Sequence, residues 1–185
     1  KRVCKTSKIK YMKSINLRYV AKSNNKNYFF YFDEPNSNTK ENPAAYSSNW
    51  KALWWDYNNV IIKIEFEKGA VVSAKFDSDK EKIIVVYNIA HSKQYPAPNN
   101  CVVYNIDGTV HKIISTPVLK TPDENGNFIK GHHFDTVGWA KNKQNKTVLF
   151  LRVDEREWDW VPWYEDIEFN PELGEFGDLI WRATH

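Results

Sequence analysis

The stretch that decides the fold is Cys101-Val-Val-Tyr-Asn-Ile-Asp-Gly-Thr-Val-His-Lys-Ile-Ile114. Two runs rich in β-branched and aromatic residues, 101–106 and 109–114, flank the dipeptide Asp107-Gly108. Asp-Gly readily adopts the positive φ angles that a two-residue hairpin turn requires. The stretch therefore predicts two antiparallel strands joined by a tight turn.

Similar strand-like runs continue from this hairpin toward both ends of the chain. They are rich in β-branched and aromatic residues, several of them alternate between apolar and polar side chains, and turn-forming residues separate them. In chain order they are 11–20, 28–32, 60–67, 70–76, 83–89, 133–140, 147–153, 158–169 and, as a strand or short helix, 176–181. This pattern predicts a mainly β protein, built as an antiparallel meander, a sandwich or a partly closed barrel.

One short helix is predicted within residues 44–57. Trp50, Leu53, Trp54 and Tyr57 recur at helical spacing, and a serine at 47 or 48 could cap the first turn. The fold class expected from the sequence is therefore mainly β with one short helix.

Length and composition predict a single β-rich domain over residues 1–185. The hydrophobic content of 42% is sufficient for a core. No run approaches the roughly 20 apolar residues of a membrane-spanning helix, and residues 1–26 contain no apolar leader segment. Cys4 and Cys101 are expected to be free thiols, with a disulfide between them as the alternative. We therefore expect a cytoplasmic protein that does not enter a membrane.

The charge is distributed unevenly between the two ends of the chain. Residues 1–26 contain nine Lys or Arg and no acid, whereas residues 154–185 contain ten acids and two arginines. The basic end, which also carries tyrosines, could bind nucleic acid through phosphate contacts and base stacking. The favoured interpretation is a solvated, lysine-rich edge strand that prevents pairing between sheets.

Catalytic and metal chemistry have one candidate cluster, His132-His133-Phe134-Asp135. In a strand, His133 and Asp135 would face the same side and His132 the other. The sequence indicates neither a nucleophile nor a third metal ligand beside them, and zinc catalysis needs three protein ligands. Phosphate-loop, dinucleotide and nucleophile-elbow motifs are missing as well. We predict no catalytic residue, no metal site and no cofactor.

The segment 154–166 is the strongest candidate for a binding surface, because three tryptophans and one tyrosine lie among six acids there. Exposed aromatic residues surrounded by carboxylates are typical of a protein-binding hot spot with a charged rim. The predicted partner-binding residues are Glu155, Glu157, Trp158, Asp159, Trp160, Trp163 and Tyr164.

Two other interpretations of this segment remain open. Its rings could pack in the core while its acids pair with the basic N-terminal strands. Alternatively, the aromatic residues, together with Trp50, Trp54 and Trp55, could stack on sugars in a carbohydrate-binding module.

Two stretches resemble parts of small bacterial immunity proteins, which accompany the toxins of polymorphic or contact-dependent growth inhibition systems. They are residues 101–114 and Phe-Asn-Pro-Glu-Leu-Gly-Glu-Phe-Gly at 169–177. The resemblance implies a cytoplasmic, non-enzymatic protein that neutralises a cognate toxin by occluding it. A basic toxin such as a nuclease would suit the acidic segment. These families share no universal functional residues, so the resemblance assigns a role to none.

Overall fold

The computed structural model describes residues 18–23, 26–31, 50–67, 72–87, 92–123, 125–155 and 163–183, with 18–23, 26–31 and Trp50 described by their backbone alone. In this part of the chain the fold is entirely β, with twelve strands in three four-stranded antiparallel sheets and no helix. The predicted mainly β, antiparallel class is confirmed, and the described sheets do not close into a barrel. The prediction of a single domain over 1–185 remains untested.

The middle and third sheets are meanders of consecutive strands, whereas in the first sheet β1 lies between β2 and β3. The first sheet has the order β2-β1-β3-β4 and contains β1 (Arg18–Ser23), β2 (Lys26–Tyr31), β3 (Trp50–Tyr57) and β4 (Val60–Glu65). The middle sheet runs β5-β6-β7-β8, with β5 (Val72–Phe76), β6 (Lys82–Tyr87), β7 (Cys101–Asn105) and β8 (Val110–Ile114). The third sheet has the order β12-β11-β10-β9, from β9 (His133–Lys141), β10 (Thr147–Asp154), β11 (Tyr164–Asn170) and β12 (Glu175–Ala183).

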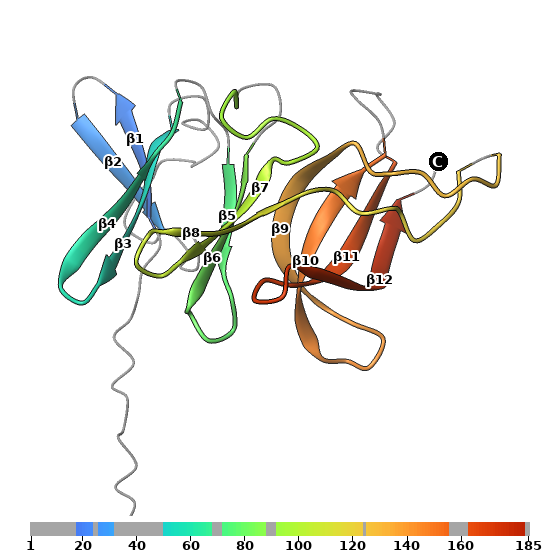
Figure 1. The fold of residues 1–185 in the computed structure, drawn as a ribbon. Helices are drawn as coiled ribbons and strands as arrows, with labels where there is room; N and C mark the ends of the chain where they lie inside the picture. The colour runs from blue at the N-terminus through green and yellow to red at the C-terminus, as the bar shows by residue number, and fades with distance from the viewer. Residues whose placement is uncertain are drawn as a thin grey trace, which may run out of the picture.

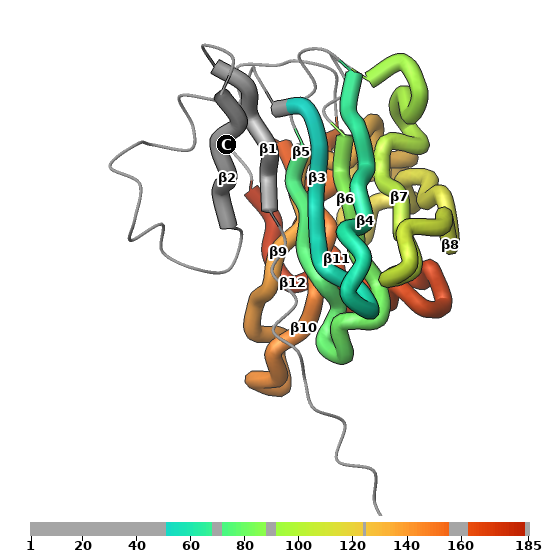
Figure 2. The backbone as a smooth tube through the Cα atoms, turned by 90° about the vertical axis from the view of Figure 1, so that its left-hand side faces the viewer, coloured from blue at the N-terminus to red at the C-terminus, as the bar shows by residue number. Residues whose placement is uncertain are grey.

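The three sheets form three layers, and the middle sheet lies between the other two (Figure 1). The turned view in Figure 2 shows the same stacking, with β3 and β4 in front of the middle sheet and β9–β12 behind it. Each face of the middle sheet therefore supplies one core. Ile84, Val86 and Val103 pack with the third sheet. Ile83, Val85 and the other alternate residues of β6 and β7 pack with Leu53 and Trp55 of the first sheet.

The predicted hairpin at residues 101–114 is confirmed as β7 and β8. Gly108 at its turn has a φ of 89°, which few side-chain-bearing residues adopt. A Cβ at this position would lie 2.6 Å from Ile62 Cγ2, so the turn also approaches the first sheet closely. Glycine is required here for both reasons.

The predicted helix at residues 44–57 is wrong in its described part, because Trp50–Tyr57 is strand β3. Leu53 and Trp55 are completely buried, which is the alternation of a strand facing a core. The Trp55 indole nitrogen donates to the carbonyl oxygen of Ile106 at 2.7 Å. Pairing with β1 and β4 on both sides outweighs the helical spacing of the aromatic residues. Residues 44–49 lie outside the described residues.

Asn100 connects the middle sheet to the third sheet through a fully buried side-chain amide. Its Nδ2 donates to the carbonyl oxygens of Tyr87 and Phe134, each at 2.7 Å. Its Oδ1 accepts from the backbone N–H of Phe134 at 2.9 Å. The amide thus pairs with β9 as a peptide group of a neighbouring strand would, and it satisfies backbone groups that water cannot reach.

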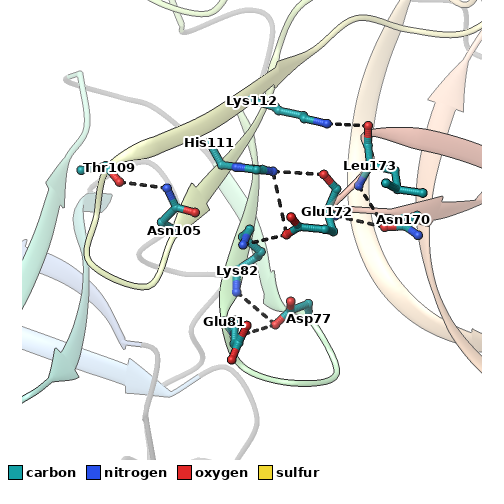
Figure 3. Close-up of polar contacts among 10 residues, drawn as sticks. All are labelled: Asp77, Glu81, Lys82, Asn105, Thr109, His111, Lys112, Asn170, Glu172 and Leu173. Carbon is teal, nitrogen blue, oxygen red and sulfur yellow. Dashed lines mark hydrogen bonds and ion pairs between the residues drawn. The ribbon is translucent and has the colours of Figure 1, made fainter.

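The β11–β12 turn is attached to the middle sheet by polar contacts (Figure 3). Lys112 Nζ donates to the carbonyl oxygen of Leu173 at 2.6 Å, and Lys82 Nζ lies 2.8 Å from Glu172 Oε2. His111 Nε2 lies 3.1 Å from the Glu172 carbonyl oxygen, which accepts, so this nitrogen carries the proton. The Lys82 ammonium lowers the pKa of the Glu172 carboxyl. These contacts hold the third sheet on the middle sheet at its polar edge.

The structure bears in part on two expectations, that the cysteines are free thiols and that the chain does not enter a membrane. Cys101 is a free, buried cysteine, and burial raises the pKa of its thiol. Cys4 lies outside the described residues. In the described part of the chain, no helix has the length and apolar character needed to cross a bilayer.

We predict that Asn100→Ala lowers the free energy of unfolding by about 3 kcal/mol, because three buried backbone groups lose their partner. Urea denaturation followed by fluorescence measures this loss. Asn99→Ala, at the exposed neighbouring position, is the matched control and should change stability by less than about 0.5 kcal/mol. Equal stability of the two variants would contradict the role of the amide.

Candidate functional site

The structure describes three of the seven predicted partner-binding residues. Glu157, Trp158, Asp159 and Trp160 lie outside the described residues, within 156–162. The ends of that segment meet, because the Glu155 backbone N–H donates to the Trp163 carbonyl oxygen at 2.9 Å. Glu155 and Trp163 therefore lie side by side, at the end of β10 and the start of β11.

Two acids of the predicted stretch, Glu155 and Glu165, are buried. Glu155 is 8% exposed, so its side chain presents little surface to a partner. Glu165 is 1% exposed, and its carboxylate accepts from the backbone N–H groups of Lys120 and Thr121 at 2.7 and 2.9 Å and also from the Thr121 hydroxyl. These two carboxylates are therefore internal, as one of the open interpretations expected. The hydrogen bonds of Glu165 come from a loop rather than from the N-terminal strands.

A row of interacting side chains crosses the face of the third sheet that is turned away from the middle sheet. Leu151 and Val153 face the core, so Arg152 between them faces outward. Arg152 pairs in register with Asp166, and Asp166 with Trp181. We call the set Arg152, Tyr164, Asp166 and Trp181 the arginine–aromatic row.

The geometry of the arginine–aromatic row is tightly defined. Arg152 Nε and Nη2 donate to the two oxygens of Asp166 at 2.8 and 3.0 Å. The guanidinium carbon lies 3.8 Å from the centre of the Tyr164 ring, and that ring lies 5.4 Å from the ring of Trp181. The bond to Asp166 raises the pKa of Arg152. Because these contacts already restrict the side chains, a partner would lose little conformational entropy on binding them.

The same face carries a second cluster, which we call the carboxylate end and which consists of His133, Asp135 and Asp154. His133 Nε2 lies 3.1 Å from Asp154 Oδ2. Asp135 is exposed, yet partial burial of its carboxyl raises its pKa, and the negative charge of Asp154 raises it further. Arg152 and His133 oppose this shift without cancelling it.

The predicted orientation of the histidine cluster is partly wrong. Asp135 does share the electrostatic surroundings of His133, as a strand would place it. However, the carboxylate bonded to His133 is Asp154, from the neighbouring strand. His132 does not turn to the opposite side, since its Nδ1 lies 3.2 Å from the Nδ1 of His133. The reason is that β9 begins at His133, so strand alternation does not apply to His132. Among the described residues, no group of three or more potential ligands could hold a metal ion.

The tryptophans of the carbohydrate alternative give it little support. Trp55 is fully buried and hydrogen-bonded in the core, so its ring cannot stack on a sugar. The ring of Trp54 is half-buried, with Lys63 Nζ 5.6 Å from its centre. Trp50 is described by its backbone alone, so its side chain does not bear on this alternative.

A cleft of about 540 Å³ lies elsewhere, between the β5–β6 turn and the third sheet. Its lining includes Asp79, Trp139, Phe169 and Glu175. It is separate from the arginine–aromatic row, because Trp139 and Phe169 belong to the core-facing side of the third sheet.

Of the row, sequence reasoning predicted only Tyr164 as a binding residue and missed Arg152, Asp166 and Trp181. The apolar residues at 149, 151 and 153 already indicated that Arg152 faces outward. No comparable signal connected Trp181 to Tyr164, because their contact depends on the pairing of β11 with β12.

Comparisons of the chain with protein-family models, curated proteins and solved structures find no match. The resemblance of residues 101–114 and 169–177 to immunity proteins therefore stays a prediction.

We predict that Asp135→Asn raises the melting temperature near neutral pH. A raised carboxyl pKa means that the folded state holds the proton more tightly than the unfolded state. Ionised Asp135 therefore costs stability at about pH 7, and the cost disappears as the pH falls below its ordinary pKa of 3.8. Thermal unfolding at about pH 7 and about pH 3 tests this. Asp178→Asn, at an exposed position of β12, is the control, and an equal rise of its melting temperature at about pH 7 would contradict the prediction.

Proposed function

We propose that this chain is a non-enzymatic binding protein that neutralises a protein partner, most specifically a bacterial toxin that it occludes. The observation that carries the proposal is the arginine–aromatic row on the exposed face of the third sheet. Trp, Tyr and Arg are the residue types enriched in binding hot spots. Trp181 is 52% exposed, although it lies beside Tyr164 and pairs in register with Asp166.

The position of the row supports a protein partner. Tyr164 lies two positions after the end of segment 156–162, which holds two tryptophans and two acids in its sequence. Arg182 also lies 5.6 Å from the ring of Trp163, at the point where that segment rejoins the sheet. The predicted residues Trp158 and Trp160 belong to the stretch of sequence that directly precedes Trp163 and Tyr164.

Charge favours a basic partner over nucleic acid at this face. Asp135, Asp154, Asp166 and Glu168 lie on outward-facing positions of β9 to β11. Carboxylates speed the encounter with a basic protein and repel phosphate groups. A basic toxin such as a nuclease suits this face, and occlusion in the cytoplasm requires no catalytic residue. The nucleic-acid alternative depends on residues 1–26, which are mostly outside the described structure, and it stays a prediction.

The decisive experiment is protection of cells that express the toxin encoded beside this chain. Co-expression should restore growth, and Trp181→Ala should weaken the affinity of the purified pair by about ten-fold or more, the size of a hot-spot loss. Trp139→Ala is the matched control, because Trp139 is an exposed tryptophan on the opposite side of the same sheet. Its affinity should stay within about two-fold of the natural protein.

Two outcomes would contradict the proposal. One is that the intact chain neither binds the toxin nor restores growth. The other is that Trp139→Ala weakens binding as much as Trp181→Ala, which would place the interface elsewhere.

A further inference from the structure

The guanidinium and the imidazole on the exposed face of the third sheet already contact other groups. Both oxygens of Asp166 accept from Arg152, whose guanidinium also lies against the Tyr164 ring. His133 Nε2 is directed at Asp154. One guanidinium and one imidazole therefore serve two carboxylates, while the face carries four.

Two carboxylates of the face are left over, Asp135 and Glu168. Glu168 has a buried oxygen and also lines the cleft, so Asp135 is the exposed one of the two. It is exposed, and within the described residues no hydrogen bond or ion pair joins its carboxylate to a donor. The register shift between Phe134 and Thr136 makes Asp135 the extra residue of a β-bulge opposite Arg152, and the charges of Arg152 and Asp166 act on its carboxyl. Asp135 thus belongs to the same face as the arginine–aromatic row, at the other side of the sheet from Trp181.

The spacing between Trp181 and Asp135 suits a single partner segment. The two residues lie on the outermost strands β12 and β9, which are three interstrand spacings, or about 14 Å, apart. A helix or loop of a partner covers such a distance. An aromatic contact at one end and a charge contact at the other would also determine its orientation.

We propose that Asp135 receives a lysine or arginine side chain of the basic partner, at the carboxylate end of the face whose aromatic end is Trp181. This inference rests on the proposed binding function and specifies the partner's chemistry at that surface. A metal ion is a poorer occupant, since no suitable group of three ligands exists among the described residues.

Electrostatics support the assignment. The raised pKa of the Asp135 carboxyl, caused first by partial burial and then by Asp154, means that its negative charge is poorly stabilised in the free protein. A cation from a partner would stabilise that charge directly. The free protein therefore carries a small local cost that binding removes.

The test uses the full chain labelled with ¹⁵N and a probe peptide of alternating lysine and glycine, with an alternating glutamate and glycine peptide as the charge control. Titration of the lysine peptide should shift the amide signals of β9 near Asp135. Asp135→Asn should weaken its binding by about five-fold, the size of one favourable surface charge contact. Asp79→Asn, at the acidic cleft between the sheets, should leave the affinity within about two-fold of the natural chain.

Three results would overturn the inference. The first is no response at Asp135 to the lysine peptide, and the second is an equal response to the glutamate peptide. The third is a loss of binding in Asp79→Asn but not in Asp135→Asn, which would assign the cation to the cleft.

The toxin experiment separates this inference from the proposed function. If Trp181→Ala weakens toxin binding and Asp135→Asn leaves it unchanged, the face binds its partner without the proposed cation contact. If the lysine peptide binds at Asp135 while the chain gives no protection, the cation contact stands and the toxin function does not.

Discussion

The burial of β6 and β7 on both faces is the constraint on which the other layers of this protein depend. An antiparallel sheet can leave one face in water, but here each face of the middle sheet supplies its own core. Residues 83–87 are apolar without interruption, so exposing either face of β6 to water would cost free energy. The first and third sheets are the two covers that such a strand requires.

A sheet enclosed in this way must satisfy its backbone where the layers meet, because water does not enter. The Asn100 amide does this between Tyr87 and Phe134, and the Glu165 carboxylate does it for the loop at Lys120 and Thr121. Both groups are buried, and both contact main-chain atoms. The side chains of Asn100 and Glu165 therefore satisfy buried backbone groups of the fold.

The outward face of the third sheet has a different character, since no described sheet covers it. Arg152, Asp166, Tyr164 and Trp181 bond and stack with one another there, while Asp135 retains a charge without a described partner. Self-contained contacts orient the aromatic residues, and the uncompensated charge gives the face its negative sign. The third sheet therefore carries both side chains that hold one another in place and a carboxylate without a described partner.

Local sequence was sufficient for most strands, because alternation and turn chemistry are local properties. The hairpin 101–114 and strands β9 and β10 follow from them directly. The strand at Trp50–Tyr57 did not, because its aromatic spacing fits a helix and only pairing with β1 and β4 selects the strand. The three-layer stacking was also missed, although the continuous apolar run in β6 indicated burial on both faces.

In the candidate site, too, some features follow from the sequence and others only from the tertiary structure. The sequence by itself determined the strand class, the tight turn at Gly108 and the concentration of acids and aromatic rings near the C-terminus. Tertiary structure alone decided that Glu155 and Glu165 are buried, that His133 bonds to Asp154, and that Trp181 lies beside Tyr164. The physical reason is that these contacts join neighbouring strands or loops, and their register depends on how the whole sheet packs against its core.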